Sequence, residues 1–287
     1  MDRDWVIRVL GPIDLLTAAG VQSIGSRHCR AVLGALVVSG GQVVSIDRLR
    51  GVIWGDAPPK SADNSLQTYV SRLRRLVGTD ALLHSDHAYR LAVERSQVDA
   101  LRFEDLLIRA TELRSDPCRC QAVCREALTL WRGDPFGDLC DDEAFRLEAQ
   151  RLEELRLGVI ELDLEAELAL GNHEIVVAEL ESAVEEHPYR EHLWYLLVEA
   201  EASGRRNAMG PYRVNTRATA DLDDGGERRA ALGRRLARRF AASDKIDYER
   251  LAKRGQRARG RWARRGTRDD RAGLSDRASD APVGGRF

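Results

Sequence analysis

The sequence predicts a mostly α-helical protein, in which a small N-terminal domain of short antiparallel strands and three helices precedes an all-α domain. Two observations lead to this prediction. Up to about residue 95, short β-rich runs alternate with helical patterns, whereas from Val98 onward the apolar residues recur with helical periodicity. The chain has 287 residues, which is long enough for two domains that each have a core.

The N-terminal 95 residues predict strands, two helices, a longer helix and a hairpin, in that order. Ser26 and Ser45 are placed to cap the first two helices, and Gly40-Gly41 ends the first of them. The predicted strands are short, and turn residues separate them; they are 5–10, 13–16, 21–24, 82–84 and 89–93. The last two strands form the hairpin.

The longer helix, at residues 61–77, is the element around which this domain is organised. Pro58-Pro59 stops the structure before it, and Ser61 can cap it by accepting a hydrogen bond from a first-turn N–H. Its apolar residues have the i, i+3, i+4, i+7 spacing of an amphipathic helix. At roughly 100° per residue they fall within about a third of the circumference; they are Leu66, Tyr69, Val70, Leu73, Leu76 and Val77.

The opposite face of this helix carries amides, hydroxyls and arginines, and it has no acid from Asn64 onward. Arg, Asn and Gln can reach two base-edge atoms at once, while Ser and Thr donate to phosphates, so the composition predicts a DNA-recognition helix. The residues best placed to face bases are Asn64, Gln67, Thr68, Ser71 and Arg75, and the flanking Arg72 and Arg74 are better placed to bind phosphates. Taken alone, the pattern also fits an amphipathic surface helix without a special role.

The order of the elements matches a winged helix, whose third helix enters the major groove and whose hairpin lies along the DNA backbone. Residues 6–93 resemble the OmpR-type winged helix of the Streptomyces antibiotic regulatory protein family. The resemblance is carried by Leu10-Gly11-Pro12, Val43-Val44-Ser45, Leu49, Ile53-Trp54-Gly55, Pro58-Pro59, Ser61 through Leu76, and Tyr89-Arg90-Leu91.

The hairpin, or wing, contains two further candidate DNA contacts. His87 and Arg90 are placed to touch the DNA backbone or the minor groove, although His87 fits an exposed loop residue equally well. The chain departs from the family at Ala88, because the family usually has Gly before the residue equivalent to Tyr89. Since a glycine there usually serves a positive φ, the substitution predicts an altered geometry at the wing tip.

The helical patterns after Val98 resemble the bacterial transcriptional activator domain that follows the winged helix in the same family. In that family the helices stack like tetratricopeptide pairs, although the patterns and loop lengths fit a plain bundle equally well. The predicted helices include one through Leu101 and Leu107, a second from Val123 to Trp131, and three more at 142–170, 173–186 and 191–202. The resemblance is carried by Val98-Asp99, Phe103-Glu104, Ala127-Leu128, Leu130-Trp131-Arg132-Gly133, Arg151 through Arg156, Glu186-His187-Pro188 and Arg190-Glu191.

These patterns divide the chain into a winged-helix domain at 1–95, a helical activator domain at 97–245 and a basic tail at 253–287. The net charge of −1 hides a segregation, with +3 on residues 1–95, −11 on residues 96–252 and +7 on residues 253–287. The acidic middle would repel a polyanion that the two ends tolerate. Residues 228–240 are helix-like and strongly basic. The tail at 253–287 has too few apolar residues to fold, so we expect the tail to be disordered.

Several classes of protein are not favoured by the sequence. There is no run of about 18 apolar residues, no secretory signal and no disulfide framework among the five cysteines, so we expect a cytosolic protein. GxSxG, HExxH and GxxxxGK[ST] motifs do not occur, so we expect neither a catalytic site nor a cofactor. Cys118, Cys120 and Cys124 lack the CxxC knuckle and second ligand pair of a structural zinc site, which argues against a metal site.

The resemblance implies a DNA-binding transcriptional regulator. By analogy with the family, it would be an activator that binds direct repeats upstream of a promoter as a homodimer and recruits RNA polymerase, with the loop at 55–60 facing the polymerase. An alternative is a helical adaptor or scaffold whose DNA binding is weakened or lost, which Ala88 and the weaker match after Tyr212 favour. A repressor with the same site geometry fits the sequence as well.

Overall fold

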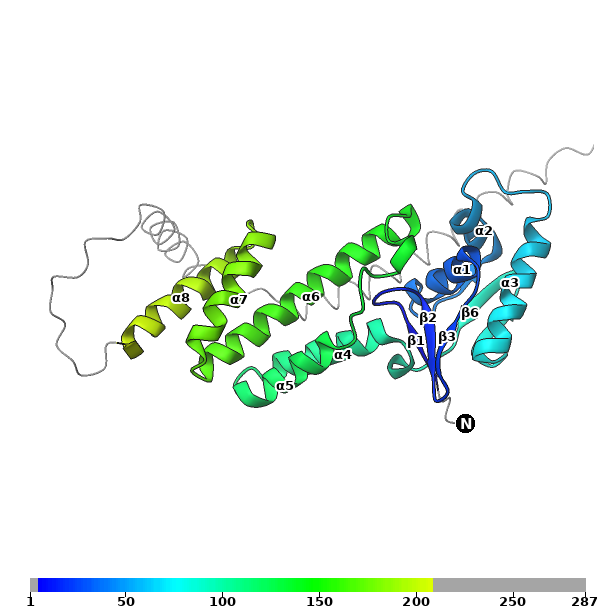
Figure 1. Cartoon of the computed structure of the whole chain (residues 1–287). Coiled ribbons are helices and arrows are strands. Elements are labelled where there is room, and N and C mark those ends of the chain that lie inside the picture. The colour runs from blue at the N-terminus through cyan, green and yellow to red at the C-terminus, as the bar shows by residue number, and fades with distance from the viewer. Residues whose placement is uncertain (1–4, 209–287) are drawn as a thin grey trace, which may run out of the picture. The chain divides into compact units, whose positions relative to one another are not determined.

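The computed structural model describes residues 5–208, which form two compact units (Figure 1). The first unit contains residues 5–104 and 130–154, and the second contains residues 105–129 and 155–208. The division passes through two helices, so α4 (Asp99–Glu112) and α6 (Glu143–Ala169) each contribute to both units. The end of the predicted helical domain, up to residue 245, and the predicted tail at 253–287 lie outside the described residues.

Three short strands at the start of the first unit form an antiparallel sheet in the order β1–β2–β3. They are β1 (Trp5–Arg8), β2 (Asp14–Thr17) and β3 (Gly20–Ser23). Because side chains of a strand alternate between its two faces, Ile7 and its cross-strand partner Leu15 are both fully buried, while the next residue, Leu16, is exposed. The predicted N-terminal sheet is therefore confirmed.

Three helices follow this sheet along the chain. The first packs against the other two, and two of the three begin with the predicted caps. They are α1 (Arg27–Val38), α2 (Ile46–Trp54) and α3 (Ala62–Val77). The Ser26 hydroxyl accepts from the Cys29 N–H at 3.3 Å, and the Ser45 hydroxyl accepts from the Arg48 N–H at 3.2 Å. Each hydroxyl thereby satisfies a backbone donor that has no partner within the helix.

The predicted cap at Ser61 is wrong in its chemistry, although Ser61 does precede the first residue of α3. Its side chain makes no capping hydrogen bond, and its φ of −92° and ψ of 12° lie outside the extended region typical of capping residues. The chain enters the helix through a main-chain hydrogen bond instead, from the Ala62 N–H to the Pro59 carbonyl at 2.9 Å.

A second small sheet forms the wing, in the order β4–β6–β5. Its strands are β4 (Val44–Ser45), β5 (Leu82–Ser85) and β6 (Ala88–Leu91). The two-residue loop between β5 and β6 has positive φ at Asp86 (41°) and His87 (59°), the pattern of a type I′ turn. The prediction of an altered wing tip at Ala88 is wrong, because Ala88 is a buried strand residue that pairs with Ser45 and Ser85. The positive φ values fall on the two residues before it.

Residues 130–154 pack into the same unit as the winged helix. The Arg132 N–H donates to the Leu10 carbonyl at 2.8 Å, and the Phe136 N–H donates to the Val9 carbonyl at 2.7 Å. Phe145, near the start of α6, is fully buried and lies so close to Gly34 of α1 that an added Cβ there would be 2.9 Å from its ring. The core of the first unit therefore extends past the winged helix.

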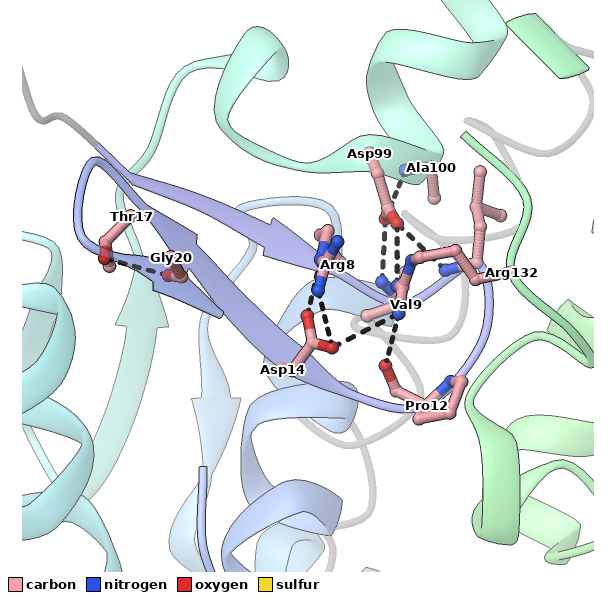
Figure 2. Close-up of polar contacts among 10 residues, drawn as sticks. Arg8, Val9, Pro12, Asp14, Thr17, Gly20, Asp99, Ala100 and Arg132 are labelled. Atoms are coloured by element: carbon pink, nitrogen blue, oxygen red, sulfur yellow. Dashed lines mark hydrogen bonds and ion pairs between the residues drawn. The ribbon is translucent and has the colours of Figure 1, made fainter. Parts of the chain in front are cut away.

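A buried polar cluster lies where α4 begins (Figure 2). The carboxylate of Asp99 accepts from the Val9 N–H at 2.8 Å and from the Leu10 N–H at 3.0 Å. The guanidinium of Arg132 lies 3.5 Å from Asp99 and 3.2 Å from Asp14. Burial raises the pKa of Asp99 to about 6, although these N–H donors and Arg132 oppose the increase.

The helix prediction around Trp131 needs one correction. The helix α5 (Pro117–Leu128) ends three residues earlier, so Trp131 does not belong to it. Its ring instead packs edge-to-face on Phe103 in the first unit, with 5.3 Å between the ring centroids. Trp131 continues the apolar spacing of α5, but it lies beyond the end of that helix and packs in the core of the first unit.

The second unit is entirely helical within the described residues. It contains the later parts of α4 and α6 together with α5, α7 (His173–Glu186) and α8 (Glu191–Ala208), and α7 packs against α8. The core is aliphatic and includes Leu164, Leu168, Val176, Leu180, Leu193, Leu196 and Ala200. The predicted all-α character of the chain after Val98 is confirmed up to residue 208, whereas the predicted domain boundaries stay a prediction.

Two of the three cysteines on α5 are buried. Cys120 and Cys124 are buried, Cys118 is exposed, and the Cys120 thiol donates to the Ala110 carbonyl at 3.3 Å. Within residues 5–208, no three His, Cys, Asp or Glu side chains are grouped to hold a metal ion. No helix in this part of the chain has both the length and the apolar content needed to cross a bilayer.

Candidate nucleic-acid interface

The helix α3 has the two faces that the sequence predicts. Leu66, Val70, Leu73 and Val77 are buried, with relative exposures of 2% or less, which fixes the rotation of the helix. The predicted base-facing residues are all exposed on the other side, and so is Arg72; Arg74 is half-buried. These exposed residues are Asn64, Gln67, Thr68, Ser71, Arg72 and Arg75.

Two hydrogen-bonding details of α3 follow from its helical backbone. The Thr68 hydroxyl donates to the Asn64 carbonyl one turn earlier, at 2.9 Å. It must rotate away from this carbonyl before it can donate to a base, because a hydroxyl has a single proton to donate. Near the N-terminus, Asp63 lies 3.6 Å from Arg50 of α2, which offsets the charge of the one carboxylate in the helix.

Arg74 joins α3 to the wing. Its Nε donates to the Leu82 carbonyl at 3.0 Å, and its Cζ lies 5.9 Å from the ring centroid of Tyr89. A guanidinium at this distance over an aromatic face is attracted by the ring. Arg74, predicted only as a phosphate contact, therefore also has a structural role.

Arg72 lies against the turn that precedes α1. A Cβ added to Gly25 would be 2.5 Å from the Arg72 Cζ, and Gly25 has a φ of +105° that favours glycine. Burial raises the pKa of the nearby Cys29 thiol, while the positive charges of Arg72 and Arg30 oppose the increase. Gly25 thus leaves room for the arginine at the edge of the exposed face.

The wing places both of its predicted contacts at the surface. His87 and Arg90 are exposed. The main chain of the wing tip is fixed by a hydrogen bond, in which the His87 carbonyl accepts from the Ile46 N–H at 2.9 Å. This bond connects the wing tip to the first residue of α2. The His84 and Tyr89 rings, 4.8 Å apart, pack along the hairpin.

An aromatic cluster supports α3 and was not predicted as part of the site. His28 of α1, Trp54 of α2 and Tyr69 of α3 have ring centroids 5.9 to 6.5 Å apart. The Tyr69 hydroxyl lies 3.2 Å from the His28 Nδ1, within hydrogen-bonding distance. The spacing of α3 assigns Tyr69 to the apolar face, but no local sequence signal identifies its partners 41 and 15 positions away.

The geometry thus defines a class: a winged-helix protein with an exposed, acid-poor third helix, followed by a helical region. Two family models match the chain in the same order. The model described as "Transcriptional regulatory protein, C terminal" matches residues 24–87, and the model described as "Bacterial transcriptional activator domain" matches residues 98–238.

Individual relatives point to the same family. The regulatory protein DnrI of Streptomyces peucetius is 32% identical over 243 residues, which cover 79% of this chain and 88% of DnrI. The regulatory protein AfsR of Streptomyces griseus is 35% identical over 217 residues. These residues are 74% of this chain, which spans only 22% of AfsR.

A solved structure shows the same fold. Mycobacterium tuberculosis EmbR, in complex with a low affinity phosphopeptide, superimposes with a TM-score of 0.69 and 29% sequence identity. The match covers 90% of this chain and 70% of the EmbR chain. The chain belongs to the Streptomyces antibiotic regulatory protein family of transcriptional regulators.

Proposed function

We propose that this protein binds double-stranded DNA sequence-specifically by inserting α3 into the major groove. One observation carries the proposal: from Asn64 to Arg75, the exposed face of α3 presents amide, hydroxyl and guanidinium groups and no carboxylate. The wing and the aromatic cluster hold this face in a fixed orientation. A helix of this composition on a rigid support can read base edges with little loss of entropy on binding.

The proposed roles follow from the chemistry of each side chain. Arg75 and the amides can make paired hydrogen bonds to purine edges, and the hydroxyls can make single hydrogen bonds to base edges. The flanking arginines position the protein on phosphates. Base contacts are assigned to Asn64, Gln67, Thr68, Ser71 and Arg75, phosphate contacts to Arg72 and Arg74, and backbone or minor-groove contacts to His87 and Arg90.

Fluorescence anisotropy of the full chain against a selected pool of genomic duplexes, across a salt series, tests this proposal. We expect a subset to bind with nanomolar affinity, roughly tenfold or more above random DNA, and Arg75→Ala to remove that preference. Arg119→Ala is the matched control, because Arg119 is an exposed arginine on α5. Weak binding that is equal for all duplexes and indifferent to Arg75→Ala would refute the proposal.

We further propose that the protein is an activator that acts in the cytoplasm. Two copies would bind side by side on direct repeats upstream of a promoter and recruit RNA polymerase, with the loop at 55–60, exposed throughout, facing the polymerase. Footprinting should show protection of two adjacent repeats, and transcription in vitro with purified polymerase should rise when the protein is added. A footprint that overlaps the promoter together with reduced transcription would identify a repressor instead.

The adaptor alternative has lost one of its two supports. Ala88 pairs with Ser85 in the wing, and the positive φ values of the turn fall on Asp86 and His87. The alanine therefore no longer argues for lost DNA binding. The weaker match after Tyr212 lies outside the described residues. Absence of any duplex affinity that depends on Arg75 would favour the adaptor.

A further inference from the structure

A groove of about 330 Å³ runs between α7 and α8 on the surface of the second unit. The two helices lie side by side (Figure 1). The floor of the groove is apolar and consists of Val184, Pro188, Trp194, Leu197 and Val198. The Trp194 indole N–H donates to the Pro188 carbonyl at 3.0 Å, so the polar group of this side chain is already satisfied.

The described rim of the groove is acidic. Glu181, Glu185 and Glu201 line it, and none of its described lining residues is a lysine or an arginine. Glu181 and Glu185, one turn apart on α7, are exposed, and neither forms an ion pair with a side chain that the structure describes. An apolar floor bordered by carboxylates suits an amphipathic helix with an apolar stripe and basic flanks.

The same chain contains a segment with this pattern. Leu232, Leu236 and Phe240 follow the i, i+4, i+8 spacing of one helix face. Residues 228–240 also hold six arginines and no acid, and at roughly 100° per residue Arg235 and Arg239 flank the apolar stripe on one side.

Chain length allows this segment to reach the groove. Nineteen residues, 209–227, separate α8 from the segment, and a chain of that length can span on the order of 60 Å. We propose that the groove between α7 and α8 binds residues 228–240 of the same chain as an amphipathic helix. The stripe covers the floor, and the arginines meet the glutamates of the rim. This proposal does not depend on DNA binding.

Hydrogen–deuterium exchange of the full 287-residue chain, followed by mass spectrometry, tests the proposal. In the wild-type protein, amides of residues 228–240 should exchange roughly tenfold or more slowly than in the isolated peptide of the same sequence. The double variant Glu181→Lys/Glu185→Lys should lose this protection. The control Glu186→Lys/Glu191→Lys makes the same change of charge at exposed residues of the same helices that do not line the groove, and it should retain the protection.

A charge swap completes the test. Adding Arg235→Glu/Arg239→Glu to the groove variant should restore protection, because opposite charges would again face each other. Unprotected residues 228–240 in the wild type would overturn the proposal. Protection that survives the groove variant would show docking elsewhere, and protection that rises with protein concentration would show a second copy in the groove. Either result would also overturn it. Unchanged exchange in α6 verifies that each variant is folded.

Discussion

The Nε of Arg74 donates to the main-chain carbonyl of Leu82 at 3.0 Å, so a side chain of the candidate DNA-binding helix also holds the wing. A helix and a wing that contact one DNA duplex must keep a fixed separation. This hydrogen bond contributes to that separation from within the site, which distinguishes Arg74 from the neighbouring, exposed Arg75.

Substitution of these two arginines should therefore have different effects. Arg74→Ala removes a charged donor to a backbone carbonyl and should lower the free energy of unfolding by about 1–2 kcal/mol, as well as weaken DNA binding. Arg75→Ala, at an exposed position, should change stability by less than about 0.5 kcal/mol and weaken DNA binding only. Urea unfolding beside anisotropy measures both quantities. Equal stability of the two variants would show that the contact with Leu82 contributes nothing.

Alanine substitutions at two glycines can separate the effect of backbone strain from the effect of displacing Arg72. Gly25 and Gly20 have φ values of +105° and +111°, so alanine at either should cost about 1–3 kcal/mol of stability. An added Cβ at Gly25 would be 2.5 Å from the Arg72 guanidinium, whereas at Gly20 it would meet nothing within 4 Å. Gly25→Ala should therefore also weaken DNA binding, because Arg72 must move, and Gly20→Ala should not. Equal DNA affinity of the two variants would contradict a role for Arg72 in binding.

The sequence predicts those elements that depend on near neighbours along the chain. The rotation of α3 follows from the spacing of Leu66, Val70 and Leu73, and the caps at Ser26 and Ser45 depend on amides three residues away. The assignment of the exposed residues of α3 to DNA contacts remains a prediction, since exposure is shown and binding is not.

Contacts between distant parts of the chain could not be predicted in this way. Arg74 and Leu82 are eight residues apart, but their contact depends on how the hairpin packs. The Arg132 N–H bonds to Leu10 across more than a hundred residues. The prediction at Ala88 failed for a related reason, because which residue of a hairpin takes positive φ depends on the strand register.

Four charged residues in the motifs that resemble the activator domain form ion pairs in the structure. Asp99, Glu104, Arg132 and Arg151 were recognisable as family residues, but nothing in the sequence shows that they pair. In the first unit, Arg132 contacts Asp99, and Arg151 donates to Glu104 at 2.6 Å. Arg132, which also contacts Asp14 of β2, joins the helical segments to the winged helix, and Arg151 joins α6 to α4.

The pair formed by Glu104 and Arg151 should be a sensitive point of stability. Glu104 is fully buried, and its carboxylate accepts from Arg151 and from Arg95 at 3.2 Å. Arg151→Ala removes the shorter of these two hydrogen bonds to the buried carboxylate. It should lower the free energy of unfolding by about 3–5 kcal/mol. Arg146→Ala, at an exposed position of the same helix, should cost less than about 0.5 kcal/mol. Urea titration of both variants measures the difference, and a cost below about 1 kcal/mol at Arg151 would exclude a major role for this ion pair.

The buried carboxylate of Asp99 should make the stability of the first unit depend on pH. Its pKa rises from 3.8 to about 6 on folding, because burial disfavours the charged form more than its N–H donors and Arg132 favour it. A raised pKa stabilises the folded state below the unfolded value, and this contribution is lost as pH increases through the folded value. By linkage, the loss between about pH 3.5 and 7 is about 3 kcal/mol.

The variant Asp99→Asn isolates this contribution, because asparagine does not titrate and other groups shift both proteins equally. The wild type should be more stable than the variant by a margin that shrinks by about 3 kcal/mol as the pH increases from about 3.5 to 7. Urea unfolding of both proteins across this range measures the margin. A margin that instead grows with pH would mean that the folded protein lowers the pKa of Asp99, so that the N–H groups of Val9 and Leu10 and the charge of Arg132 outweigh the cost of burial.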